Sequence, residues 1–129
     1  MKIEHLAIWV HDLEIMRSFY LKYFDTSSGE KYVNPKTQFV AYFILFGESK
    51  TRLEIMTRPD IELISGKRGF KMGLAHFTIS VGGKDKVNEL TERLRRDNYI
   101  IFSEPRTTGD GYYESVVLDP EGNYLEISS

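Results

Sequence analysis

The chain has no cysteine, only four prolines and a single tryptophan among its 129 residues. Without cysteine it can form no disulfide, no thiolate metal site and no cysteine nucleophile, and a reducing compartment is its natural setting. No apolar run approaches the roughly 20 residues that a membrane-spanning helix needs, and the first residues lack the apolar segment of a signal peptide. We therefore expect a cytoplasmic protein.

Neither sign of charge is in marked excess. The 17 basic and 19 acidic residues leave a net charge of −2, and they form no basic stripe, so we expect neither nucleic acid nor a membrane as a partner. A chain of this length can bury roughly 70% of its unfolded surface, which is enough for one domain with a real core. The sequence therefore predicts a single domain, residues 1–129, that acts on a small molecule.

What the sequence does contain is an internal duplication. Two pairs of segments match, namely 5–10 (HLAIWV) with 76–81 (HFTISV), and 52–56 (RLEIM) with 124–128 (YLEIS). The first pair is offset by 71 positions and the second by 72. Each half thus contains one histidine and one glutamate at matched places, His5 with Glu54 and His76 with Glu126.

Both halves show the same succession of expected elements, a strand, a helix and three strands. In the first half, residues 1–57, these are a strand at 3–10, a helix capped by Asp12 that ends before 25–29, a weakly indicated strand at 30–33, and strands at 38–46 and 51–57. In the second half, residues 74–129, they are a strand at 74–81, a helix at 85–97, and strands at 98–102, 113–118 and 124–128, with a loop at 104–111. Residues 58–73 read as a linker with a short helical turn. The pattern predicts an α+β fold of two βαβββ modules.

The alternation of apolar and polar residues along these strands indicates on which face of the sheet the four repeated residues lie. Side chains on a strand point alternately to opposite faces. One row of each strand is uniformly apolar and must pack beneath a helix, so the other row faces away from the core, on the concave side of the sheet. His5, Glu54, His76 and Glu126 all fall on this second row.

Imidazole and carboxylate together, without thiolate, suit borderline and hard divalent ions. A strand histidine by itself is more often a hydrogen-bonded surface or core residue, but the repeated placement on one face favours a metal site. We expect one divalent metal per site, Ni, Zn, Co, Mn or Fe, held by His5, Glu54, His76 and Glu126. His11 has no counterpart in the second half, and we expect it at the surface.

At this point the chain resembles the vicinal oxygen chelate superfamily, which includes glyoxalase I, methylmalonyl-CoA epimerase, extradiol dioxygenases and the fosfomycin and bleomycin resistance proteins. The motifs that carry the resemblance are the opening EHLAIWV with a following FY, the central HFTISV and the closing DPEGNYLEI. The resemblance covers the whole chain and implies the glyoxalase, bleomycin resistance and dioxygenase fold, with a mixed curved sheet and helices on its convex face. It also implies that the four repeated residues hold the metal positions of the glyoxalase I type.

The resemblance further implies a glyoxalase I-like, divalent-metal-dependent lyase or isomerase of the lactoylglutathione lyase type. In such proteins the metal acts as a Lewis acid and stabilises an enediolate formed when a proton leaves the carbon beside a carbonyl. A metal-bound glutamate detaches to move that proton, and we expect Glu126 in this role, with Glu54 as second choice. The resemblance to glyoxalase I proteins of similar length also implies that this chain forms a homodimer.

The substrate stays open, because two positions depart from the family pattern. Bacterial glyoxalase I carries an arginine and an asparagine, which help to hold glutathione, where this chain has Trp9 and Arg58. We expect Trp9, Tyr42, Arg58 and Tyr113 to bind the substrate, on a wall that other aromatic residues could extend. Two alternatives remain: a small-molecule sequestering protein of the bleomycin-resistance type, with or without metal, and an extradiol dioxygenase, which uses two histidines and one glutamate around Fe(II).

Overall fold

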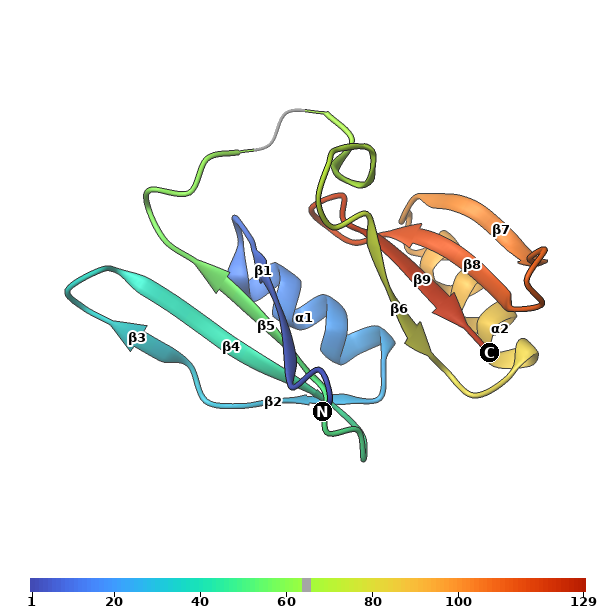
Figure 1. Cartoon of the computed structure of the whole chain (residues 1–129), viewed down its shortest axis with the longest axis horizontal. Coiled ribbons are helices and arrows are strands. Elements are labelled where there is room, and N and C mark those ends of the chain that lie inside the picture. The colour runs from blue at the N-terminus through green and yellow to red at the C-terminus, as the bar shows by residue number, and fades with distance from the viewer. Residues whose placement is uncertain (64–65) are drawn as a thin grey trace. The chain divides into compact units, whose positions relative to one another are not determined.

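The computed structural model describes residues 1–63 and 66–129, which form two compact units divided between Leu63 and Ile64. Each unit consists of one helix packed on one face of its own mixed β-sheet (Figure 1). Among the described residues, no helix has the length and apolar character that crossing a membrane requires.

Unit 1 is a sheet of five strands with one helix, α1. Its elements are β1 (His5–Trp9), α1 (Leu13–Tyr23), β2 (Thr26–Ser28), β3 (Tyr32–Asn34), β4 (Phe39–Phe46) and β5 (Arg52–Thr57). The strand order is β1-β5-β4-β2, and β3 also pairs with β4. Strand β1 runs parallel to β5, whereas the other pairs are antiparallel. Strand β5 therefore lies at the centre of the sheet, between the strand that carries His5 and the long strand β4.

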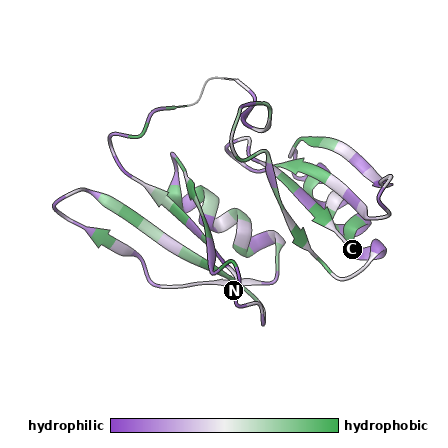
Figure 2. Ribbon diagram, viewed as in Figure 1, coloured by the Kyte–Doolittle hydropathy of each residue, from purple (hydrophilic) through white to green (hydrophobic). Residues whose placement is uncertain are grey.

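Helix α1 forms where the sequence predicted it and covers one face of this sheet. Asp12 caps it, with a side-chain oxygen that accepts a hydrogen bond from the backbone N–H of Ile15 at 2.9 Å, a contact typically worth about 1 kcal/mol. Its apolar side chains Met16 and Tyr20 are fully buried. They meet the apolar row of the sheet, and strand β4 is mainly hydrophobic along its length (Figure 2).

Unit 2 repeats the plan with four strands and the helix α2. Its elements are β6 (His76–Ser80), α2 (Lys84–Arg96), β7 (Ile101–Thr107), β8 (Tyr113–Leu118) and β9 (Tyr124–Ser128), in the sheet order β6-β9-β8-β7. Strand β6 runs parallel to β9, as β1 does to β5. The second module is therefore a topological copy of the first.

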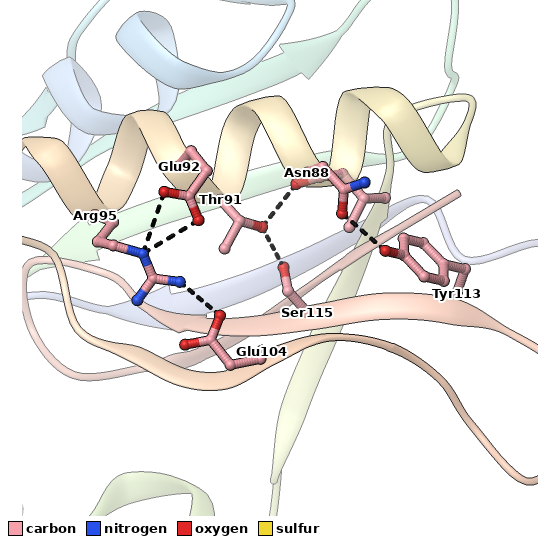
Figure 3. Close-up of polar contacts among 8 residues, drawn as sticks. Asn88, Thr91, Glu92, Arg95, Glu104, Tyr113 and Ser115 are labelled. Carbon is pink, nitrogen blue, oxygen red and sulfur yellow. Dashed lines mark hydrogen bonds and ion pairs between the residues drawn. The ribbon is translucent and has the colours of Figure 1, made fainter.

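Polar contacts, as well as apolar ones, fasten α2 to its sheet (Figure 3). The hydroxyl groups of Thr91 on α2 and Ser115 on β8 lie 2.7 Å apart, and both residues are fully buried. Nearer the start of the helix, the hydroxyl of Tyr113 donates to Asn88 at 2.8 Å. At the other end, Arg95 bonds Glu104 on β7 at 2.5 Å.

Residues 66–75, which precede β6 and which we call the connector, pack onto the sheet of unit 2. A single 3-10 turn, η1 (Arg68–Phe70), provides the short helical turn expected in the linker. The ring of Phe70 lies 5.7 Å from that of Tyr124 on β9, which lies 4.8 Å from that of Phe102 on β7. Arg68 donates from Nη1 to Asn123 at 2.9 Å. These contacts lie on the sheet face opposite α2, at the end of β9 that precedes Glu126.

The predicted fold class, two βαβββ modules, is confirmed, with two local differences. Where one weak strand was expected at 30–33, β2 and β3 both pair with β4, and the step between them contains one more residue than the facing part of β4, as in a β-bulge. Where a loop was expected from 104 to 111, β7 continues to Thr107. Pro105 is tolerated there because β7 is an edge strand with shifts of register.

Candidate functional site

The sheet of unit 1 has one face covered by α1 and one face that we call open face 1. Burial alternates along β1 and β5: Ile8, Leu53 and Ile55 are buried, whereas His5 is exposed and Glu54 is half-buried. The alternation predicted from the sequence is therefore present, and it places His5 and Glu54 on open face 1.

His5 and Glu54 lie side by side on this face. The ring atom Nε2 of His5 is 3.6 Å from Oε2 of Glu54, too long for a hydrogen bond. The other ring nitrogen, Nδ1, is hydrogen-bonded to the carboxylate of Glu4, and the ring of Phe43 meets the imidazole edge to face at 5.5 Å. Glu4 also accepts from Arg52. Hydrogen bonds from His5 and Arg52 lower the pKa of Glu4, so this carboxylate stays charged and turns Nε2 toward Glu54.

Unit 2 contains the equivalent pair on the face opposite α2, which we call open face 2. Nε2 of His76 is 3.3 Å from Oε1 of Glu126. The second carboxylate oxygen of Glu126, Oε2, accepts a hydrogen bond of 2.7 Å from the hydroxyl of Thr78, its register partner on β6. The position that matches Thr78 in unit 1 is Ala7, the register partner of Glu54, so only the second pair has this hydroxyl.

The two pairs repeat each other in exposure as well as in position. The glutamate side chains are both 16% exposed, whereas His5 and His76 are 39% and 46% exposed. With metal–ligand distances of about 2.0–2.2 Å, donor atoms about 3.0–3.6 Å apart subtend angles of roughly 90–120° at an ion. Each pair therefore fits two neighbouring coordination positions of a divalent ion. Within residues 1–63 and 66–129, no group of three or more His, Asp or Glu side chains is arranged to hold a metal, and each pair by itself offers two donor groups.

The residues expected to bind substrate separate into two groups. Trp9 lies on open face 1, two residues beyond Ala7, and the guanidinium carbon of Arg58 is 5.5 Å from its ring centroid. Tyr42 and Tyr113 lie instead on the helix-covered faces. Tyr42 is the register partner of the buried Ile55 and donates to Glu14 on α1 at 3.1 Å. Tyr113 bonds α2 in the same way, so neither tyrosine is brought to an open face.

One further ionisable residue on open face 2 was not anticipated. Glu114 pairs in register with Ser128, two residues from Glu126, and its side chain is 13% exposed. Burial, followed by the negative charge of Glu126, raises the pKa of Glu114, although Arg106 opposes the shift. The register of β8 against β9 reveals this placement, but the sequence alone offered no signal for it, because Val116 and Val117 hide the alternation of β8.

Comparison with known proteins agrees with this architecture. The model of the glyoxalase/bleomycin resistance protein/dioxygenase superfamily matches residues 2–127, whereas no curated protein sequence matches significantly. Among solved structures, the chain is similar to the trypanothione-dependent glyoxalase I of Leishmania major, with a TM-score of 0.77, 23% identity, and coverage of 100% of this chain and 86% of that one.

Two further structures show the same fold. A glyoxalase family protein from Enterococcus faecalis has a TM-score of 0.78 and 19% identity, with 99% of this chain and 97% of that chain covered. A glyoxylase/bleomycin resistance protein/dioxygenase domain from Frankia sp. EAN1pec has a TM-score of 0.82 and 16% identity, with coverage of 99% and 96%. With the paired modules and a family match over nearly its whole length, the chain belongs to the glyoxalase/bleomycin resistance protein/dioxygenase superfamily.

Proposed function

We propose that this protein is a divalent-metal-dependent lyase or isomerase of the glyoxalase I type. The observation that carries the proposal is the repeated pair, His5 with Glu54 and His76 with Glu126, at matched places on the two open faces. The two pairs together would hold one ion of Ni, Zn, Co, Mn or Fe, since imidazole and carboxylate are donors that suit all of these metals. We further propose that the working form is a homodimer.

The bound metal would supply Lewis-acid polarisation of a substrate carbonyl. The chain's own residues position the ligands and move the proton. The charged carboxylate of Glu4 holds the ring of His5 by Nδ1 and leaves Nε2 available. Glu126 takes a proton from the hydroxyl-bearing carbon next to the carbonyl and returns it to the former carbonyl carbon, while the hydroxyl proton passes to the former carbonyl oxygen, so that the substrate is isomerised without net gain or loss of protons.

The surroundings of the two glutamates favour Glu126 over Glu54 for this proton transfer. Thr78 bonds one carboxylate oxygen of Glu126 at 2.7 Å, so that oxygen stays in place while the other accepts or releases the proton. Ala7, beside Glu54, has no group that can do this. Glu54 therefore serves as a ligand in the proposed arrangement, and Glu126 as a ligand and base.

One observation favours a second candidate, a small-molecule sequestering protein of the bleomycin-resistance type. Trp9 and Phe39 form an aromatic pair on open face 1, with ring centroids 6.2 Å apart, and Trp9 is 37% exposed. Aromatic surface of this kind also suits binding without chemistry. Turnover separates the two candidates, because a sequestering protein binds its ligand unchanged.

The direct test is isomerisation of the hemithioacetal of methylglyoxal and glutathione by protein loaded with each of the five metals. Turnover that depends on added metal would establish a glyoxalase I activity. If the protein takes up metal but does not convert this compound, the proposed metal chemistry would stand, and the substrate would be another carbonyl compound. Protein that takes up none of the five metals and turns over nothing would overturn the proposal in favour of the sequestering protein.

A further inference from the structure

Open face 1 carries a row of aromatic side chains beside Glu54. Trp9 follows Ala7, the register partner of Glu54, by two residues on β1, a distance of about 6.6 Å along a strand. The ring of Trp9 meets that of Phe39 edge to face at 6.2 Å, and the ring of Phe39 lies 6.0 Å from that of Tyr32. The row thus extends over β1, β4 and β3, next to the proposed metal ligands.

These rings leave apolar surface open. Trp9 is 37% exposed and Tyr32 is 58% exposed. Because an edge-to-face contact uses only part of the indole surface, the row can accept a further planar ring, and aromatic pairs add about 0.5–1.5 kcal/mol beyond the area that they bury. The small side chain of Ala7 leaves space between this row and His5 for a ligand that reaches both.

A positive charge accompanies the rings. The guanidinium carbon of Arg58 lies 5.5 Å from the centroid of Trp9. Its Nε donates to Asp60 at 2.5 Å, but both side chains are exposed, 39% and 66% respectively. An exposed ion pair of this kind is weak, and one bond does not exhaust the five N–H donors of a guanidinium. Arg58 can therefore bind a negatively charged group of a ligand that lies on Trp9.

The corresponding row of unit 2 has a different character. The repeat offset matches Trp9 with Ser80, whose register partner Ser128 pairs in turn with Glu114. This row of unit 2 thus carries hydroxyl groups and a carboxylate, whereas the matching row of unit 1 runs from Trp9 to Met56 and Ala41. The combination of aromatic surface and positive charge is therefore a property of this sequence in unit 1, and the fold does not require it.

We propose that the substrate is a carbonyl compound that carries an aromatic ring and a negatively charged group, with the ring on Trp9 and the charge on Arg58. The placement of the reacting carbonyl beside His5 and Glu54 rests on the proposed function. Binding of the ring and the charge requires no metal, so it can be measured separately.

The test uses the fluorescence of Trp9, which is the only tryptophan of the chain and so reports directly on this position. The metal-free, full-length protein is titrated with phenylglyoxylate, with pyruvate, which lacks the ring, and with acetophenone, which lacks the charge. We expect a saturable change with phenylglyoxylate, at concentrations about tenfold lower than with either of the other compounds.

Matched variants assign the binding to the two residues by calorimetry. Trp9→Ser installs the residue that unit 2 has at this position and should weaken phenylglyoxylate binding about tenfold, whereas Trp9→Phe should retain most of it. Arg58→Gln should reduce the affinity for phenylglyoxylate to about that for acetophenone. Ser80→Ala, the equivalent change in unit 2, should leave the affinity unchanged.

Equal affinity for the three compounds, or an unchanged affinity in Trp9→Ser, overturns the inference. So does dissociation of a dimer by Trp9→Ser without loss of affinity, because the aromatic row would then be a contact between two copies of the chain. Preferred binding of phenylglyoxylate by a protein that takes up no metal would reject the proposed function and support this inference. Metal-dependent turnover without a preference for the ring would support the proposed function and reject this inference.

Discussion

Glu126 is the single residue on which the proposed proton transfer depends. Glutamine keeps its size and one carbonyl oxygen but cannot accept the proton. Glu126→Gln should therefore lower the turnover of a metal-loaded protein at least about 100-fold, while part of the metal stays bound through the other ligands. Steady-state rates and metal content on the same preparation check both statements.

The control for this variant is Glu48→Gln, an exposed carboxylate in the turn after β4. It should change neither the rate nor the metal content. Full activity in Glu126→Gln would remove Glu126 from the proton transfer and leave Glu54 as the remaining candidate.

Glu114 gives a prediction about pH. Because burial and the charge of Glu126 raise the pKa of Glu114, the folded chain holds this proton more tightly than the unfolded chain. The contribution of Glu114 to the free energy of unfolding therefore falls as the pH rises from about 4 to 7. With chelator present, Glu114→Gln should raise the urea midpoint at pH 7, and leave it nearly unchanged at pH 4. A lower midpoint at pH 7 would show that the carboxylate is stabilised by its surroundings.

At the scale of elements, the connector depends on a close approach at Gly69. A Cβ on Gly69 would lie 2.6 Å from Cδ2 of Tyr124 and 2.9 Å from the carbonyl oxygen of Ala75. Gly69→Ala should therefore displace η1 from β9 and lower the free energy of unfolding by about 1–3 kcal/mol. Urea denaturation followed by circular dichroism measures this change.

Gly109→Ala is the matched control, because nothing lies within 4 Å of a Cβ at that position. Alanine there reduces the entropy of the unfolded chain and should leave the stability equal or slightly higher. Equal stability of the two alanine variants would mean that the connector does not pack closely against Tyr124.

Sequence patterns predicted the elements well where local signals are strong. The bounds of β8 and β9 agree with the structure, and so does the capping of α1 by Asp12. The sequence patterns failed at β7, because Pro105 suggested a loop. A proline is acceptable there only because β7 lies at the edge of the sheet. Local patterns do not contain such pairing information.

The same limit applies to the candidate site. Alternation placed His5, Glu54, His76 and Glu126 on the open faces, because polar and apolar side chains alternate clearly in their strands. In β4 both neighbours are aromatic, so alternation could not separate Tyr42 from Phe43, and only the register does: Phe43 pairs with Glu54. Contacts between strands distant in sequence, such as that of Thr78 with Glu126, follow from the fold.

At the scale of the whole molecule, the proposed homodimer is the first prediction. In the proposed arrangement each unit contributes two of the four metal ligands, and a symmetric dimer would form two complete sites. Sedimentation equilibrium at micromolar concentration should give twice the chain mass of 15.0 kDa. A single-chain mass at that concentration would contradict the dimer, and the metal site would then have to form within one chain.

The central claim is that the two His–Glu pairs hold one metal together, and metal content tests it most directly. Protein is loaded with each of the five metals, freed of excess, and analysed beside His5→Ala, His76→Ala and the control His11→Ala. We predict about one equivalent per chain for the wild type and His11→Ala, and a nearly complete loss in each of the other two variants. Less than about 0.1 equivalent in the wild type, or a loss of only half in each variant, would contradict a shared site.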